Sequence, residues 1–325
     1  MPKQNRFRRI GQVDFTANGV KPIDLPRALL YHYLSLRLSG NVTIVTAPTT
    51  AWADAPWSLV RRVEIIADGK DTIKSIDLET LKAHNTIFYG TAPKGSAIPT
   101  AVGAAQAFNA QAILPFEMPR SVRPIDSLFD SKGLSTFTAN VTWGDVTSLY
   151  SAASANATIN SAALEFHTFE AFGISSRFAV HKQLLISKDV TAVDPNFQVL
   201  LPVGNLFRGI LIRAINYGAA PANVDPGTPS DAIINNIQLK SGTEVYFNKK
   251  GPDTQDDNKR LYSVETWPAG CYMIDFTQDG MQTESLDARA LSSLELILDV
   301  SNPATTNKIK IYPIELIQPP EPVNK

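Results

Sequence analysis

Cysteine and histidine are scarce in this sequence. Its 325 residues include one cysteine, Cys271, and four histidines, His32, His84, His167 and His181. One thiol excludes an internal disulfide, and the histidines do not stand at the spacing of a zinc site. We therefore expect a core-stabilised chain without a metal or other cofactor, in a reducing compartment. Cys271 is interpreted as a small buried hydrophobe.

Long apolar runs and an excess of one charge are also lacking. No run of about 18 apolar residues occurs, so no membrane-spanning helix is predicted. The first residues lack the apolar stretch of a secretory signal, which predicts synthesis and folding in a cytoplasm. The 30 basic and 31 acidic residues give a net charge of -1, which argues against binding nucleic acid over the whole surface. We expect no sequence-specific nucleic-acid partner.

Catalytic motifs are missing as well. The sequence has no Gly-x-Ser-x-Gly elbow, no phosphate-binding glycine loop, no dinucleotide fingerprint and no obvious pair of carboxylates for glycan hydrolysis. His32 shares the apolar parity of Leu30 and Leu34, which favours a hydrogen-bonded core histidine over a ligand. These absences predict that the protein is not an enzyme and has no catalytic residues.

One acidic cluster is a weak candidate for calcium. Asp253, Asp256 and Asp257 offer carboxylate oxygens, the ligands that calcium prefers. The cluster lacks the glycine and the terminal glutamate of an EF-hand loop. A solvated, capped start of a helix is therefore the favoured interpretation.

Alternation of apolar and polar residues is the main pattern present. It runs through 34–44, with Gly40 as a possible bulge, through 134–143, and through Leu164 and Phe166. A period of two predicts strands with one face in a core. In the second half the predicted strands cover 206–217, 233–239, 272–276, 294–300 and 308–316. Many strands at short spacing predict an all-β sandwich or barrel.

Helices are predicted at only two places, at about 75–88 and at 253–262. Three segments rich in Ala with Pro, Gly, Ser, Thr or Asn are predicted to be long surface loops: 91–112, 148–163 and 218–230.

The two halves of the chain resemble each other at three collinear places. Leu25-Pro-Arg-Ala-Leu-Leu resembles Leu206-Phe-Arg-Gly-Ile-Leu, at an offset of 181. Residues 59–65, followed by Asp68-Gly69, resemble 233–239, followed by Ser241-Gly242, at an offset of 174. Residues 129–137 resemble 286–294 at an offset of 157, each with Asp, a basic residue two positions on, and Leu-Ser entering a strand. This repeat predicts one all-β unit used twice, with longer insertions in the first copy.

Taken together, these features resemble the double jelly-roll major capsid proteins of tailless, membrane-containing icosahedral phages, the lineage of tectiviruses, corticoviruses and adenovirus hexon. The stretch Trp267-Pro-Ala-Gly-Cys-Tyr resembles their Pro-x-Gly-x-Tyr segment. The resemblance implies two tandem eight-stranded jelly-roll barrels with a few short helices. The expected organisation is a basic arm over 1–15, jelly rolls over 16–172 and 173–317, and a proline-rich arm over 318–325.

The family also implies a function. The expected protein is a major capsid protein whose pseudo-hexagonal homotrimers form an icosahedral shell around an internal membrane in a bacterial host. Its partners would be itself, penton and minor capsid proteins, and lipid. The alternatives are a tandem jelly-roll lectin or receptor-binding protein and a jelly-roll glycan hydrolase, but the long loops are poor in the aromatic and acidic residues that such sites use.

Two sets of residues are candidates for contacts. Lys3, Arg6, Phe7, Arg8 and Arg9 form a basic segment that would attract anionic headgroups by about 1 kcal/mol per charge, and a disordered tail is the equally weighted alternative. Trp52 and Trp57 flank Pro56 and are candidate interface anchors, although core packing at a strand entrance is the favoured interpretation.

Overall fold

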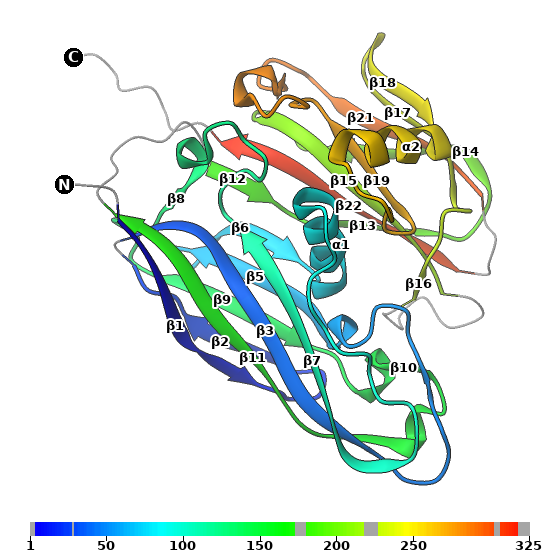
Figure 1. Ribbon diagram of the computed structural model, residues 1–325. Helices are drawn as coiled ribbons and strands as arrows, with labels where there is room; N and C mark the ends of the chain where they lie inside the picture. The colour runs from blue at the N-terminus through cyan, green and yellow to red at the C-terminus, as the bar shows by residue number, and fades with distance from the viewer. Residues whose placement is uncertain (1–3, 28, 173–179, 218–226, 302–305, 318–325) are drawn as a thin grey trace.

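The computed structural model describes residues 4–27, 29–172, 180–217, 227–301 and 306–317. Within these ranges the chain is all-β, with many strands and two short α-helices. Neither helix is long and apolar enough to cross a membrane. The predicted fold class is confirmed, since the strands form two jelly-roll barrels that lie side by side (Figure 1).

The first barrel consists of two four-stranded antiparallel sheets. One has the order β1 (Gln4–Asp14), β11 (Ala157–Phe172), β3 (Leu30–Ile44), β7 (Gly103–Pro115). The other has the order β2 (Val20–Asp24), β9 (Phe137–Trp143), β5 (Val60–Ala67), β6 (Asp71–Ile76). Short strands β4 (Thr50–Ala51), β8 (Phe129–Asp130) and β10 (Tyr150–Ala152) lie at its ends.

The second barrel repeats this arrangement strand for strand. Its first sheet has the order β13 (Ile186–Val190), β22 (Asn307–Ile317), β15 (Leu206–Asn216), β19 (Cys271–Asp275). Its second has the order β14 (Asp194–Leu201), β21 (Leu294–Val300), β17 (Ile234–Ser241), β18 (Glu244–Lys250). Short strands β16 (Thr228–Pro229) and β20 (Leu286–Asp287) pair with β15, as β8 pairs with β3 in the first barrel.

The repeat seen in the sequence follows these elements closely. Strands β5 and β17 start at 60 and 234, an offset of 174, as the sequence match predicted. Strands β9 and β21 start at 137 and 294, an offset of 157, and show the same alternation of buried and half-buried positions. In each barrel a hairpin leads into a helix, α1 (Leu78–Tyr89) or α2 (Gly251–Tyr262). Both predicted helices are present, although α2 starts two residues earlier than expected.

The first of the three sequence matches was in the wrong register. Leu206 pairs with Asp287, and the residue that pairs in the same way with Asp130 is Leu30, not Leu25. The structural offset, from 30 to 206, is therefore 176. Leu25 instead lies just after β2, where its amide donates to the Phe137 carbonyl.

Two of the predicted loops are partly strands. Residues 103–115 form β7, and β11 begins at Ala157 inside the second expected loop. In β7 the buried positions are Phe108, Ala110, Ala112 and Leu114, an alternation hidden by the small size of alanine. The third expected loop, 218–230, lies mostly outside the described residues.

The predicted free arm at the N-terminus is corrected by the structure. Residues Gln4–Asp14 form β1, an edge strand that pairs with β11 along its whole length. The first sheet thus starts inside the range expected to be an arm. The expected C-terminal arm, 318–325, lies outside the described residues.

Helix α1 lies between the two barrels (Figure 1). Asp77 caps its start by accepting from the Thr80 amide, and Gly90 ends it with a left-handed φ of 76°. Most of its residues are buried, because it packs on β5 and β7 and also contacts Arg208, Arg213 and Tyr312 of the second barrel. One continuous apolar cluster includes residues of both barrels, among them Leu81, Ile87, Leu211 and Met273.

Candidate functional site: the junction between the barrels and the outer faces

The junction between the barrels is built around a buried arginine. Arg213 stands on β15, and its guanidinium crosses to the first half of the chain, where it forms an ion pair with Asp54 and donates to Thr80 Oγ1 at 3.4 Å. Lys82 Nζ holds the same Asp54 carboxylate at 3.0 Å. Burial acts to raise the pKa of Asp54, but Arg213 and Lys82 outweigh it and lower that pKa.

Glu79 is the second acid near this arginine, with Oε2 at 3.7 Å from the guanidinium. Burial raises the pKa of Glu79 to about 8, with Asp77 and Asp54 adding to the rise and Lys310 and Arg213 opposing it. The contact with Arg213 favours the charged carboxylate, but burial outweighs it and favours the protonated form. Burial is the largest effect on the pKa of Glu79, and Asp54 already supplies a negative charge beside Arg213.

A second buried set connects the start of α1 to β22. Asp77 accepts from the Tyr312 hydroxyl and lies 3.2 Å from Lys310 Nζ, while it also caps the helix. Burial would raise the pKa of Asp77, but Lys310 and Arg213 outweigh it and hold that pKa at about 2. One carboxylate therefore caps a helix of the first barrel and binds a strand of the second.

These buried pairs fix how the barrels sit together. Removing one partner of a buried pair leaves a charge without compensation, which costs about 3–5 kcal/mol. Any sliding of one barrel against the other would separate Arg213 from Asp54 and Lys310 from Asp77 at the same time. Sequence analysis missed these residues, although a signal was present: Arg213 follows the apolar run 210–212, and Lys310 stands between Ile309 and Ile311.

The candidate membrane-facing residues lie on β1 and are paired within the chain. Arg6 and Arg8 both bind Glu170 at 2.9 Å, and Arg9 binds Glu165 at 3.1 Å. The Glu170 side chain has no exposed surface; burial would raise its pKa, but hydrogen bonds from Thr168, Arg6 and Arg8 lower it.

Phe7 lies on the outside of the same sheet. Its ring stacks on Phe169 at 4.3 Å and approaches Tyr33 at 6.4 Å, yet 69% of Phe7 remains exposed. Lys3 lies outside the described residues. The basic segment is thus an ordered edge strand whose described charges already have partners.

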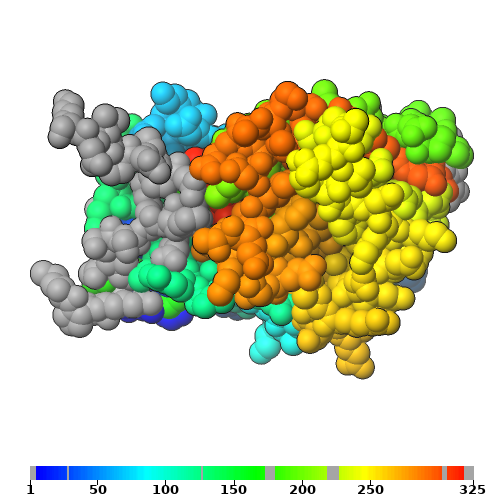
Figure 2. Space-filling model, turned by 90° about the horizontal axis from the view of Figure 1, so that it is seen from above, coloured from blue at the N-terminus to red at the C-terminus, as the bar shows by residue number. Residues whose placement is uncertain are grey.

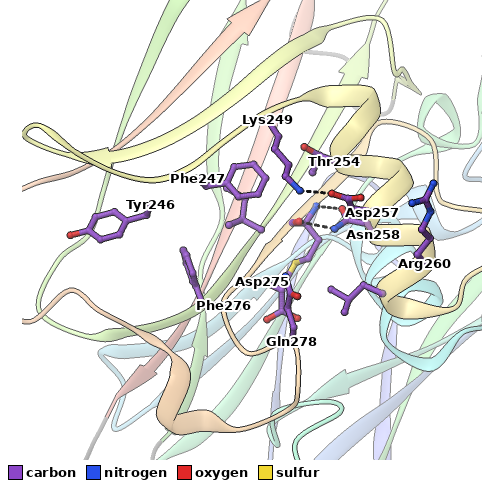
Figure 3. A pocket seen from close by; sticks show the side chains of 13 residues that line it. Tyr246, Phe247, Lys249, Thr254, Asp257, Asn258, Arg260, Asp275, Phe276 and Gln278 are labelled. Carbon is purple, nitrogen blue, oxygen red and sulfur yellow. Dashed lines mark hydrogen bonds and ion pairs between the residues drawn. The ribbon is translucent and has the colours of Figure 1, made fainter.

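The three calcium candidates lie along α2, and Asp257 lines a surface hollow of about 470 Å³ (Figure 3). Asp257 forms an ion pair with Lys249, and Asp256 lies 3.3 Å from Lys259. Asp253 stands in the first turn of the helix. No group of three or more metal-binding side chains occurs in the described ranges, so these aspartates are not brought together as a metal site.

Of the two candidate tryptophan anchors, Trp57 is buried and Trp52 is half-buried. Trp57 is 6% exposed, its indole donates to the Gln111 carbonyl at 3.1 Å, and Lys82 lies 4.5 Å from the centre of its ring. Trp52 donates to the Thr147 carbonyl at 2.9 Å. Both indoles have their hydrogen bond within the chain, and Trp57 packs in the core as the favoured interpretation expected.

The histidines and the cysteine occupy different environments. His32 is 5% exposed, with Nδ1 at 2.5 Å from Glu117, whereas His167 is half-exposed near Glu165. His84 and His181 are completely buried near the junction. Cys271 is also buried, which raises the pKa of its thiol to about 12, so it is a poor nucleophile.

The outer face of the second barrel carries α2 and the segments that follow β19, in yellow and orange in Figure 2. Among the described residues the large exposed apolar side chains are dispersed over both barrels, including Val122, Val193, Leu200 and Val245.

Comparison with known proteins agrees with this architecture. Residues 201–317, from the end of β14 to the end of β22, match the family model of the viral coat protein P2 C-terminal domain. No curated protein matches the sequence.

Solved structures match over almost the whole chain. The major capsid protein of Sulfolobus turreted icosahedral virus has a TM-score of 0.75 at 16% identity, covering 97% of both chains. Major capsid protein P2 from bacteriophage PM2 has a TM-score of 0.63 at 16% identity, covering 96% of this chain and 98% of its own. A PBCV-1 virus capsid chain has a TM-score of 0.63 at 10% identity, covering 98% and 96%. The chain therefore has the double jelly-roll fold of viral major capsid proteins, and its second barrel carries the sequence pattern of the viral coat protein P2 C-terminal domain.

Proposed function

We propose that this chain is a major capsid protein whose homotrimers form pseudo-hexagonal capsomers of an icosahedral shell around an internal membrane. The observation that carries the proposal is the repeat of one barrel, strand for strand, in two copies joined by a buried polar junction. Three such chains around a threefold axis present six similar flanks. Blocks with six similar flanks can tile a surface through repeated side-to-side contacts.

The edges of the barrels suit this role. Most backbone groups pair inside the two sheets of each barrel, which removes long open edges that would aggregate without order. The edge strand β18 is short and carries Glu244, Lys249 and Lys250 on its surface. Charged side chains on an edge strand favour specific contacts over strand-to-strand aggregation.

The two barrels point the same way. In Figure 1 the start of β1 and the end of β22 lie at one end of the molecule, and the segments around β4 and β10 lie at the other. We place the membrane at the end where β1 begins and the exterior at the other end. Penton and minor capsid proteins would complete the shell, and the virion would assemble in the cytoplasm of a bacterial host.

The assembly is tested by the mass of the purified protein. We expect light scattering after gel filtration to give a stable particle of three times 35.4 kDa. Electron microscopy of the corresponding virions should show this chain as the repeating pseudo-hexagonal block. A monomer that binds a glycan array would contradict the proposal and support the carbohydrate-binding alternative.

Membrane placement has its own test. Liposomes with anionic headgroups should carry the trimer in flotation at low salt, and a chain lacking residues 1–10 should float less. Because Arg6, Arg8 and Arg9 already have acidic partners, we expect binding to come mainly from Phe7 and to fall only modestly at moderate salt. The Phe7→Ser variant separates this contribution from the charges. Equal flotation of all three proteins would refute a membrane role for this segment.

A further inference from the structure

Four basic side chains are buried together where the barrels meet, and the function above does not use them. Lys74 comes from β6, His84 from α1, His181 from β12 (Val180–Gln183) and Arg208 from β15. Each is at most 1% exposed. We call these four residues and Gln183 the junction basic cluster.

Strand pairing brings the cluster together. Strand β12 runs antiparallel to β22 of the second barrel and touches β6 of the first in parallel, with Gln183 opposite Lys74. His181 stands two residues before Gln183 and so points to the same side of β12.

Helix α1 closes the cluster from the other side. The ring of Phe88 contacts both the His84 ring, at 4.4 Å between centres, and the Arg208 guanidinium, at 4.7 Å. Lys74 and Arg208 both act electrostatically on His84 and on His181, and His84 also acts on His181. These contacts bring the five residues together at the junction.

Several polar atoms of the cluster have no partner in the described part of the chain. These atoms are Lys74 Nζ, both ring nitrogens of His84, His181 Nε2, both amide atoms of Gln183 and Arg208 Nε. Buried polar groups are nearly always hydrogen-bonded, so a group of such atoms in one place indicates a bound species.

The charges indicate what that species is. Arg208 has a nearby acid, Asp275 at 3.7 Å, and donates to the Pro119 carbonyl at 2.6 Å. No acid of the described ranges pairs with Lys74. A buried ammonium without a counter-charge is strongly unfavourable, so Lys74 either loses its proton or binds an anion.

We propose that the junction basic cluster binds one small inorganic anion, of halide size and single charge. The Lys74 ammonium, the Gln183 amide and one N–H of His84 are its donors. His181 Nδ1 lies 3.2 Å from the Glu117 carbonyl, which accepts its proton and leaves Nε2 as an acceptor in the neutral ring. His181 Nε2 is therefore not a donor in the neutral ring, and Lys74, Gln183 and His84 bind the anion without it. Every member is buried, so the anion has to bind without its hydration shell, which disfavours multiply charged ions.

Thermal unfolding of the whole protein tests the site. Sodium chloride and sodium gluconate are compared at equal ionic strength, because gluconate is too large to enter. An anion that binds only the folded state raises Tm in a saturable way. Lys74→Met should abolish the difference between the two salts. The control Lys249→Met, on the surface beside Asp257, should keep it.

Crystals of the wild-type protein in sodium bromide give a second readout that does not depend on the variant folding. We expect an anomalous bromide peak beside Lys74 Nζ. Equal Tm values of the wild type in chloride and in gluconate would overturn the proposal. Bromide peaks confined to the outer surface, an adventitious ion only, would also overturn it. In either case Lys74 would be uncharged.

Discussion

Arg213, Lys310 and Lys74 are charged residues of strands, and all three are buried at the junction. A charge is kept inside a protein when specific partners surround it. Arg213 and Lys310 have carboxylates across the junction, whereas Lys74 has none in the described ranges. Single residues therefore decide both how the barrels dock and where an anion is needed.

Asp54→Asn should lower the free energy of unfolding by about 3–5 kcal/mol, because Arg213 then loses its charged partner. Urea unfolding at pH 7 measures the change. The matched control is Asp287→Asn, which weakens the exposed pair with Arg289 and should cost less than about 1 kcal/mol. Equal losses for the two variants would show that the junction pair is no stronger than a surface pair.

His84 and His181 should make the fold sensitive to acid. Burial, then Lys74 and Arg208, lower the pKa of both rings in the folded state, so below about pH 6.5 only the unfolded chain takes up these protons. Stability is therefore lost as pH falls below that value, by about 1.4 kcal/mol per pH unit for each histidine. Urea unfolding in gluconate at several pH values should give the wild type a steeper slope than His84→Leu/His181→Gln. The same dependence of stability on pH in both proteins would contradict the lowered pKa values of His84 and His181.

At the scale of elements, the sequence predicted strands well wherever large apolar residues alternate. Strands β3, β9, β21 and β22 lie close to their expected ranges. The sequence did not predict β7 as a strand, because its buried residues Ala110 and Ala112 are small. They lie opposite Leu38 and Leu36 of β3. Composition suggested a loop, but packing between two strands needs a small residue across from a large one. The need for a small residue at these positions comes from β3, a strand that is distant in the sequence. The local sequence pattern of β7 therefore does not reveal it.

Gly40 of β3 shows the same effect. It was expected as a bulge, but the register of β3 is regular there, and a Cβ atom would meet the Phe108 ring and the Ser161 carbonyl at 2.6 Å. Gly40→Ala should therefore destabilise the protein by about 1–3 kcal/mol through overpacking. Ser39→Ala, one residue away, should stay within about 0.5 kcal/mol. Denaturant midpoints of the two variants provide the comparison, and an unchanged midpoint for Gly40→Ala would refute the close approach.

Strand β1 depends on one buried acid. Because Glu170 holds both Arg6 and Arg8, Glu170→Gln should loosen β1 while leaving the core in place. Amide hydrogen exchange should speed up over residues 4–14 relative to the wild type, and exchange in β21 should not change. Glu165→Gln, which affects the exposed Arg9 pair, is the control with a smaller expected effect. Fast exchange of β1 already in the wild type would mean that the segment is a free arm after all.

For the whole molecule, the sequence predicted the repeat and the fold, but not the junction. The junction brings together residues that are as far apart in the sequence as Asp77 and Lys310. These two residues meet only when both barrels are folded. The boundary expected between residues 172 and 173 places β12 in the second jelly roll. That strand touches both barrels and so belongs to their junction.

Because one apolar cluster and two sets of buried pairs span both barrels, the chain should unfold as one unit. Calorimetry should give a single transition for the wild type. Lys310→Met leaves Asp77 without its buried cation and should separate the transition into two. A wild-type chain with two transitions would show that the barrels are independent.

The barrels are alike in topology but unequal in length. Strand β11 has sixteen residues against eleven in its counterpart β22, and at about 3.3 Å per residue the five extra residues add about 17 Å. If three chains assemble as proposed, the taller member of each pair would rise at every second corner. Such a block would look sixfold at its base and threefold at its outer end. The orientation of each capsomer in the lattice could then be determined from the shape of its outer surface alone.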